Sequence, residues 1–245
     1  MSKATIVFDL AFSSWKGQRG SGSTGYTELK ARLKYFQYRN DRNGHIPQEE
    51  GLERWTDRGL GPSWGDILSN CQALGSEKVL AWTLVVSPAP DLMALVPEGQ
   101  RPELVKSITE QIVETYYTER GVEVPEYSYV LHDRLTNGSQ NGGDRIQQLH
   151  THVVLPGTVP VVEGGREPFY NRSRKGHFEQ LRDITNTTFA TALDKRIGPE
   201  WRNLRVPERP LLEPIVPLPE ISDADGRSVS ELDRWFPRPP TREIE

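Results

Sequence analysis

The stretch that decides the fold spans residues 127–156 and reads YSYVLHDRLTNGSQNGGDRIQQLHTHVVLP. Its two ends, residues 127–132 (YSYVLH) and 149–155 (LHTHVVL), are rich in β-branched and aromatic side chains, which favour strands. The polar, glycine-rich run at 137–143 (NGSQNGG) is typical of a loop. These residues predict an antiparallel hairpin with a long tip, in which His132 closes the first strand.

Three of the five histidines of the chain lie in this predicted hairpin. His150 and His152 are two residues apart, so the alternation of a strand places them on one face, and pairing of the two strands brings His132 beside them. Three imidazoles that leave coordination positions open are what a catalytic metal needs, because such an ion can polarise a phosphoryl oxygen or activate a nucleophile. The alternative is separate strand histidines that only form hydrogen bonds. The ligand set alone names neither the metal nor the reaction.

Hydrophobic periodicity around the hairpin predicts two more strands and three helices. The strands span 5–12 and 79–87, and the helices span 27–39, 101–120 and 175–196. A loop is expected at 17–25 (GQRGSGSTG), before the first helix. The expected class is therefore α+β, with an antiparallel sheet flanked by helices.

Prolines and acidic residues gather at the C-terminal end of the sequence. Residues 206–245 hold eight of the 19 prolines, and nine acidic residues against five arginines. Such spacing of prolines sustains neither a helix nor a central strand. We expect one folded domain over 1–205 and an extended, acidic, Pro-rich arm over 206–245.

The net charge of −4 conceals two basic segments. Residues 16–42 carry seven Lys or Arg against two acids, and residues 166–205 carry nine against five. Together they could form a groove that faces phosphates, although ordinary solvated helix faces would have the same composition.

The composition also bears on where the protein works. No stretch approaches the roughly 18 to 20 consecutive apolar residues of a membrane helix, and the first residues lack the pattern of a secretory signal. Because Cys71 is the only cysteine, neither a disulfide framework nor a cysteine-based zinc site can form. We expect a cytoplasmic protein without a membrane segment.

The sequence resembles the plasmid mobilisation relaxases, members of the HUH endonucleases, in three segments. Residues 127–156 are similar to the relaxase metal-binding motif, in which one His ends a strand and an HxH pair begins the next. Residues 80–117 look like the strand and helix that precede that motif. Residues 21–41 (SGSTGYTELKARLKYFQYRND) look like the nucleophile motif, a basic helix that carries Tyr in the context Leu-x-Tyr. The three segments cover most of residues 20–198, and they imply the fold of an HUH relaxase.

The resemblance also implies roles for single residues. The metal ligands would be His132, His150 and His152, and the divalent ion would be Mn or Mg. The nucleophile would be Tyr35, which on an ideal helix lies about 100° from Phe36 and so off the apolar stripe.

Two other tyrosines and several cations belong to the same segments. Tyr38 also lies off the stripe formed by Leu29, Leu33 and Phe36, and is a rival or second nucleophile, whereas Tyr26 falls nearer the apolar face and is expected in the core. Candidate contacts to DNA are Lys34, Arg39, Arg42, Arg172, Arg174 and Lys175.

The activity that the resemblance implies is nicking of one DNA strand by transesterification. The product would be a 5′-phosphotyrosine adduct, formed for mobilisation of a plasmid or an integrative element. The substrate would be single-stranded or locally melted DNA at a transfer origin, and accessory DNA-processing proteins could take part. Three alternatives stay open: an HUH endonuclease of rolling-circle replication or transposition, a non-catalytic DNA-binding or metal-binding module, and a hydrolytic phosphodiesterase.

Overall fold

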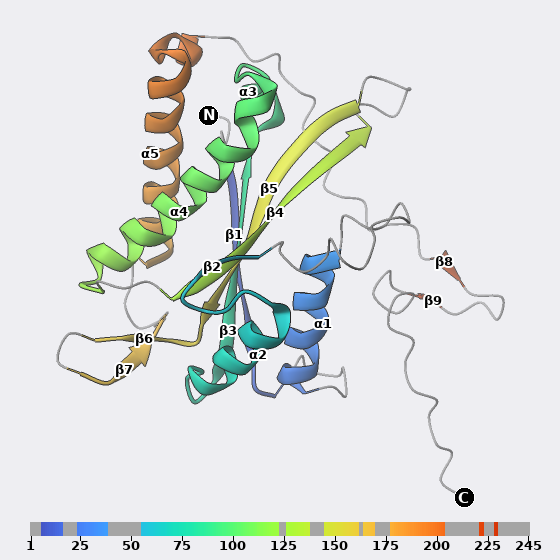
Figure 1. Ribbon diagram of the computed structural model, residues 1–245, viewed down its shortest axis with the longest axis vertical. Coiled ribbons are helices and arrows are strands. Elements are labelled where there is room, and N and C mark those ends of the chain that lie inside the picture. The colour runs from blue at the N-terminus through green and yellow to red at the C-terminus, as the bar shows by residue number, and fades with distance from the viewer. Residues whose placement is uncertain are drawn as a thin grey trace, which may run out of the picture. The chain divides into compact units, whose positions relative to one another are not determined.

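The structure is a computed structural model that describes residues 6–16, 24–38, 55–122, 126–137, 145–161, 164–169, 177–203, 221–222 and 228–229. The side chains at positions 7, 8, 38, 134–137, 145–147, 177, 178, 221, 222, 228 and 229 lie outside this description. The elements shown in Figure 1 are β1 (Ile6–Ser14), α1 (Gly25–Tyr38), β2 (Trp55–Arg58), α2 (Trp64–Ala73), β3 (Val79–Pro88), α3 (Pro90–Met93), η3 (Glu98–Gln100), α4 (Arg101–Glu119), β4 (Tyr127–Asn137), β5 (Arg145–Pro156), β6 (Thr158–Pro160), β7 (Arg166–Pro168), α5 (His177–Ile197), η4 (Pro199–Asn203), β8 (Ile221–Ser222) and β9 (Ser228–Val229).

The chain divides into two units, Met1–Arg202 and Asn203–Glu245. The first unit contains the main sheet and the helices α1 to α5. In the second unit, β8 pairs with β9 in antiparallel fashion. The expected boundary between residues 205 and 206 stays a prediction, as does the extended form of the arm.

The main sheet has five strands in the order β1-β3-β5-β4-β2. Every neighbouring pair is antiparallel. The expected α+β class, with an antiparallel sheet and flanking helices, is confirmed. The strand that carries two of the three hairpin histidines, β5, lies at the centre of the sheet, so both of its edges pair with neighbouring strands.

Helices cover the sheet on both faces (Figure 1). α1 and α2 pack on one face, where Leu33 and Ile67 share a hydrophobic core with Val130 of β4 and Val154 of β5. α4 lies on the other face, where the hydroxyls of Thr109 and Thr151 are 2.7 Å apart. Alternation along β5 therefore turns residues 150, 152 and 154 toward α1 and α2.

The hairpin of β4 and β5 is longer than the sequence predicts. His132 does not close its strand, because the ladder continues from the pair His132–His150 to the pair Asn137–Arg145. The outer half is polar, so hydrophobic alternation gives no signal there, while backbone hydrogen bonds carry the pairing onward. Residues 138–143 of the predicted loop lie outside the described residues.

The first helix, α1, begins two residues before its predicted start. A Cβ atom on Gly25 would lie 1.5 Å from the carbonyl oxygen of Ser14, so only glycine allows the helix to begin against the end of β1. Leu29, Leu33 and Phe36 are buried as predicted. The prediction for Tyr26 is wrong: its side chain is 37% exposed, because the first turn extends beyond the core that begins at Leu29.

Several short elements of the first unit were not predicted, among them β2 and α2. The start of α2 follows the rule for a helix N-cap: the Ser63 hydroxyl accepts from the backbone N–H of Asp66 at 3.2 Å and donates to the carboxylate of Asp66 at 2.6 Å. Among the helices that the structure describes, none combines the length and hydrophobicity needed to cross a bilayer.

Candidate metal site and tyrosine helix

The three hairpin histidines meet on the face of the sheet that α1 covers. His132 of β4 and His150 of β5 lie directly opposite each other. His152, two residues along β5, is paired with Val130 of β4 on one side and with Val85 of β3 on the other. The register of the hairpin thus places the three side chains together, as the sequence predicts.

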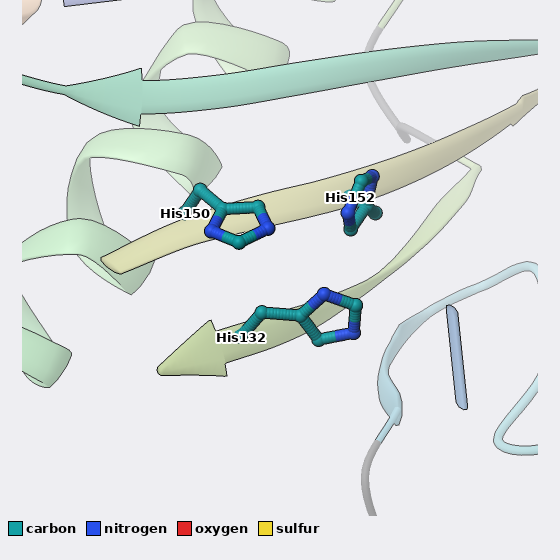
Figure 2. Close-up of side chains that lie close together, drawn as sticks. All are labelled: His132, His150 and His152. Carbon is teal, nitrogen blue, oxygen red and sulfur yellow. The ribbon is translucent and has the colours of Figure 1, made fainter. Parts of the chain in front are cut away.

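The three imidazole rings face one another in a tight group (Figure 2). Their ring centroids are 4.7 to 5.2 Å apart, and each ring offers one nitrogen such that the three nitrogens lie within 4.8 Å of one another. The exposed fractions of His132, His150 and His152 are 1%, 7% and 6%. One ion could therefore be reached by all three residues while the surroundings exclude most water.

A backbone carbonyl of α1 fixes the tautomer of His132. Nε2 of His132 lies 2.5 Å from the carbonyl oxygen of Phe36. A carbonyl oxygen only accepts, so Nε2–H is the donor, and the neutral ring then presents the lone pair of Nδ1. Nδ1 is buried, and in Figure 2 one nitrogen of His132 points between the other two rings while the second points away from them.

The same residue of α1 supports a second histidine through its side chain. The Phe36 ring stacks on the His152 ring, with centroids 4.1 Å apart and planes at 16°. His150 is oriented from its own strand by a long hydrogen bond, because Nδ1–H donates to the carbonyl of Gln148 at 3.4 Å. This bond leaves Nε2 of His150 as the nitrogen with the available lone pair.

These residues fit a divalent metal ion. Three imidazoles are a common donor set for catalytic ions, and each ligand ring usually donates its second N–H to a carbonyl or carboxylate. His132 and His150 do so here through the carbonyls of Phe36 and Gln148. The arrangement would supply three neutral ligands to such an ion.

Tyr35 precedes Phe36 on α1, and its side chain is partly buried. The Tyr35 ring packs against the core beneath α1, with its centroid 6.2 Å from that of Phe36. A hydrogen bond from Trp55 Nε1 to the side-chain oxygen of Gln37, 3.1 Å long, fixes this end of the helix to β2. Tyr38 is the last residue of α1, and its side chain lies outside the described residues.

Of the six candidate DNA-binding cations, only Lys34 lies within the described residues. The ammonium of Lys34 lies 4.6 Å from the centroid of the Trp64 ring, on the α2 side of α1, and Lys30 lies 5.8 Å from the same ring. The structure thus directs Lys34 toward α2. Arg39, Arg42, Arg172, Arg174 and Lys175 lie outside the described residues.

Two residues of α1 were not singled out from the sequence as parts of a site, Phe36, which contacts two of the histidines, and Arg32. Phe36 was assigned only to the apolar stripe, although a position next to a candidate nucleophile is a signal that it could take part in the site. Arg32 stands three residues before Tyr35, a spacing that places two side chains on one side of a helix.

Solved structures with a related course of the chain include complexes of the conjugative relaxase TrwC. A complex of TrwC with a 27-mer DNA comprising the recognition hairpin and the cleavage site matches with 12% identity and a TM-score of 0.47, over 77% of this chain and 69% of that one. The metal-bound complex of TrwC with OriT DNA matches with 13% identity and a TM-score of 0.48, over 77% and 70% of the two chains.

A third match is a structure described as the molecular basis of vancomycin resistance transfer in Staphylococcus aureus. It has 10% identity and a TM-score of 0.43, over 78% of this chain and 94% of that one. No family model matches the chain, and no curated protein matches it in sequence. The matches thus include a conjugative relaxase, the class that the motifs resemble, and at identities of 10 to 13% and TM-scores below 0.5 the likeness concerns the course of the chain alone.

Proposed function

We propose that this chain nicks DNA by metal-assisted attack of Tyr35 on a phosphodiester, as a relaxase does. The observation that carries the proposal is the double contact of Phe36 with His132 and His152. Because Tyr35 is the adjacent residue, the helix that bears the tyrosine is held against the histidine group by the chain itself. The histidine group, which could bind an ion, and the candidate nucleophile Tyr35 are thus both positioned by α1.

The reaction is a transesterification at phosphorus. The Tyr35 oxygen forms a bond to phosphorus, the bond from phosphorus to the 3′-oxygen breaks, and a 5′-phosphotyrosine remains. The proton that the tyrosine loses is matched by the one that the 3′-oxygen gains. The number of phosphoester bonds is unchanged, so a 3′-hydroxyl can reverse the step without a nucleotide cofactor.

The histidines would hold the ion, and the ion would supply Lewis acidity toward a non-bridging phosphate oxygen. His132 would bind it through Nδ1 and His150 through Nε2, because the opposite nitrogens donate to Phe36 and Gln148. The chain itself contributes orientation and the exclusion of water, which are the main contributions a protein makes to phosphoryl transfer.

The substrate we propose is single-stranded or locally melted DNA at a transfer origin, since a phosphate in a duplex could not reach buried side chains. Two solved structures of TrwC, which has a related course of the chain, are described as complexes with DNA that holds the origin or the cleavage site. We further propose Mn²⁺ or Mg²⁺ as the ion, plasmid or integrative-element mobilisation as the role, accessory DNA-processing proteins as partners, and the cytoplasm as the setting.

The test is covalent capture of DNA by the full chain. Purified protein is incubated with Mn²⁺ or Mg²⁺ and a pool of single-stranded oligonucleotides labelled at the 3′ end, the end that stays on the protein in a 5′-phosphotyrosine adduct, and the products are separated on a denaturing protein gel. We expect label that migrates with the protein in the native chain and in Tyr26→Phe, and no such label in Tyr35→Phe or His150→Ala. Tyr26 is the matched control because it is an exposed tyrosine of the same helix.

The other outcomes separate the alternatives. An adduct that survives Tyr35→Phe and disappears in Tyr38→Phe would make Tyr38 the nucleophile. Cleavage without any adduct would replace the proposal by a hydrolytic phosphodiesterase. Binding of DNA and metal with neither cleavage nor adduct, for every oligonucleotide in the pool, would indicate a non-catalytic module.

A further inference from the structure

Arg32 lies on the same side of α1 as Tyr35. With about 100° per residue, Arg32 and Tyr35 differ by roughly 60° around the helix axis and by one turn along it. Lys34 differs from Arg32 by about 160°, which agrees with its place over Trp64 on the α2 side. Of the three cations on α1, at positions 30, 32 and 34, Arg32 therefore stands beside the tyrosine.

The Arg32 guanidinium extends from the helix to the sheet. Its Nη1 donates to the Thr83 hydroxyl at 3.3 Å and to the Ser13 hydroxyl at 3.5 Å. Thr83 lies two residues before Val85 on β3, and Val85 is paired with His152. Alternation along β3 places Thr83 on the histidine face of the sheet, with its backbone on the order of 8 Å from that of His152.

The two hydrogen bonds described for Arg32 hold its side chain in place and use one nitrogen of the guanidinium. Both hydroxyl acceptors are neutral, and both bonds involve the same nitrogen, whereas a guanidinium carries five N–H donors in a planar fork. Burial lowers the pKa of this guanidinium, and the carboxylates of Glu28 and Asp9 raise it. An arginine stays protonated under all ordinary conditions, so a positive charge is fixed where α1 meets β1 and β3, on a residue one helical turn before Tyr35.

We propose that Arg32 binds a backbone phosphate of the DNA strand that Tyr35 attacks, next to the phosphate that is cleaved. This inference rests on the proposed function. It adds Arg32 to the cations that were named from the sequence as candidate contacts to DNA. Two donors of the fork would bind two phosphate oxygens, a geometry that suits arginine better than lysine. Such a contact would fix the register of the strand on the tyrosine.

The test measures DNA binding in the absence of cleavage. The full chain, in chelator and without added metal, is titrated with a fluorescein-labelled single-stranded oligonucleotide of random sequence at several salt concentrations. The variants are Arg32→Gln, Arg32→Lys and the control Arg182→Gln, which removes an exposed arginine from α5. Thermal melts of each variant report whether it is folded.

For Arg32→Gln we expect about tenfold weaker binding, the usual cost of a lost hydrogen-bonded charge contact, and a salt dependence reduced by about one phosphate contact. Arg32→Lys keeps the charge and therefore the salt dependence, with a smaller loss of affinity. Arg182→Gln binds as the native chain does. If Arg32→Gln does not fold, the comparison of Arg32→Lys with the native chain decides, because a purely structural arginine would leave the affinity unchanged.

Two results would overturn the inference in different ways. Unchanged affinity and salt dependence in folded Arg32 variants, with only a lower melting temperature, would limit Arg32 to fastening α1 to the sheet, while the proposed function would stand. A native chain that binds no single-stranded DNA would refute both the inference and the proposed function.

Discussion

Phe36 joins the two halves of the candidate site through different atoms. Its carbonyl oxygen accepts from His132, and its ring stacks on His152. The carbonyl contact survives any substitution at position 36, whereas the ring contact does not. The two contributions can therefore be separated by experiment.

We expect Phe36→Leu to weaken Mn²⁺ binding by about tenfold. This is the lower end of the loss of metal affinity that follows when a residue that orients a metal ligand is replaced. The reason is that His152 loses the ring that holds its plane, while nitrogen NMR of the histidine rings should still show His132 protonated at Nε2. Calorimetric titration of the metal-free chain with Mn²⁺ gives the affinity. No activity measurement is needed.

The matched control is Phe189→Leu on α5, since Phe189 is fully buried on a helix that packs against the opposite face of the sheet. Both substitutions remove a comparable part of the core and lower the free energy of unfolding to a similar extent. Equal Mn²⁺ affinities in the two variants would refute the role of Phe36, and protonation of His132 at Nδ1 would refute the ligand atom assigned to it.

At the residue scale, the sequence identifies which side chains belong to the candidate site. It identifies less well the direction in which each side chain points. The HxH spacing and the adjacent strand suffice to bring His132, His150 and His152 together, because strand alternation is fixed. The direction of Lys34 depends on Trp64 of α2, an element that the sequence did not predict. Arg32 and Lys34 are both cations of one basic helix, and the sequence does not distinguish them. Only the structure shows that Arg32 contacts the sheet while Lys34 lies over Trp64 of α2.

At the scale of elements, η4 is attached to α5 through one carboxylate. Asp194 accepts hydrogen bonds from Trp201 Nε1 at 2.8 Å and from the guanidinium of Arg202. The hydrogen bond from Arg202 is the main reason that the pKa of Asp194 lies below its ordinary value of 3.8, and the bond from Trp201 acts in the same direction. The contact therefore depends on ionised Asp194.

We expect Asp194→Asn to lower the melting temperature at neutral pH, by an amount that shrinks in acid. A carboxylate whose pKa is lower in the folded state stabilises the fold fully above its unfolded pKa, and loses this contribution as the pH falls through the folded value. Thermal melts from neutral pH to below 3.8 measure the difference. The control is Asp183→Asn, on the same helix, and a difference that stayed constant over the whole range would contradict the ionic origin.

Elements were predicted from the sequence where an apolar pattern marks them. The cores of β1, β3, β4 and β5 and the helices α1 and α4 follow from periodicity. The polar outer half of the β4–β5 hairpin carries no such pattern and is maintained by its backbone ladder. β2 has only four residues, and the signal for α2 was the Ser63–Asp66 spacing at its N-cap, which is short and occurs often in loops.

At the scale of the whole molecule, the core under α1 and α2 also supports the candidate site. Cys71 of α2 is fully buried in the same hydrophobic cluster as Leu33 and Phe36. Burial raises the pKa of its thiol to about 12 from an ordinary value of 9.0. Since the thiolate is the reactive form, the folded chain protects this group both by exclusion of the reagent and by suppression of its ionisation.

We expect Cys71 to resist alkylation by iodoacetamide in the folded chain at mildly alkaline pH, and to react once the chain unfolds in denaturant. As the pH rises above 9.0 the unfolded thiol ionises first, so this group lowers the free energy of unfolding progressively in alkali. Mass spectrometry of labelled protein across a denaturant series measures the reaction. Gln72→Cys, at an exposed neighbouring position of α2, should add a thiol that reacts at once.

Rapid labelling of Cys71 without denaturant would contradict this prediction. It would mean that α2 opens while the rest of the chain stays folded, and that the core shared by α1 and α2 does not hold α1 in place.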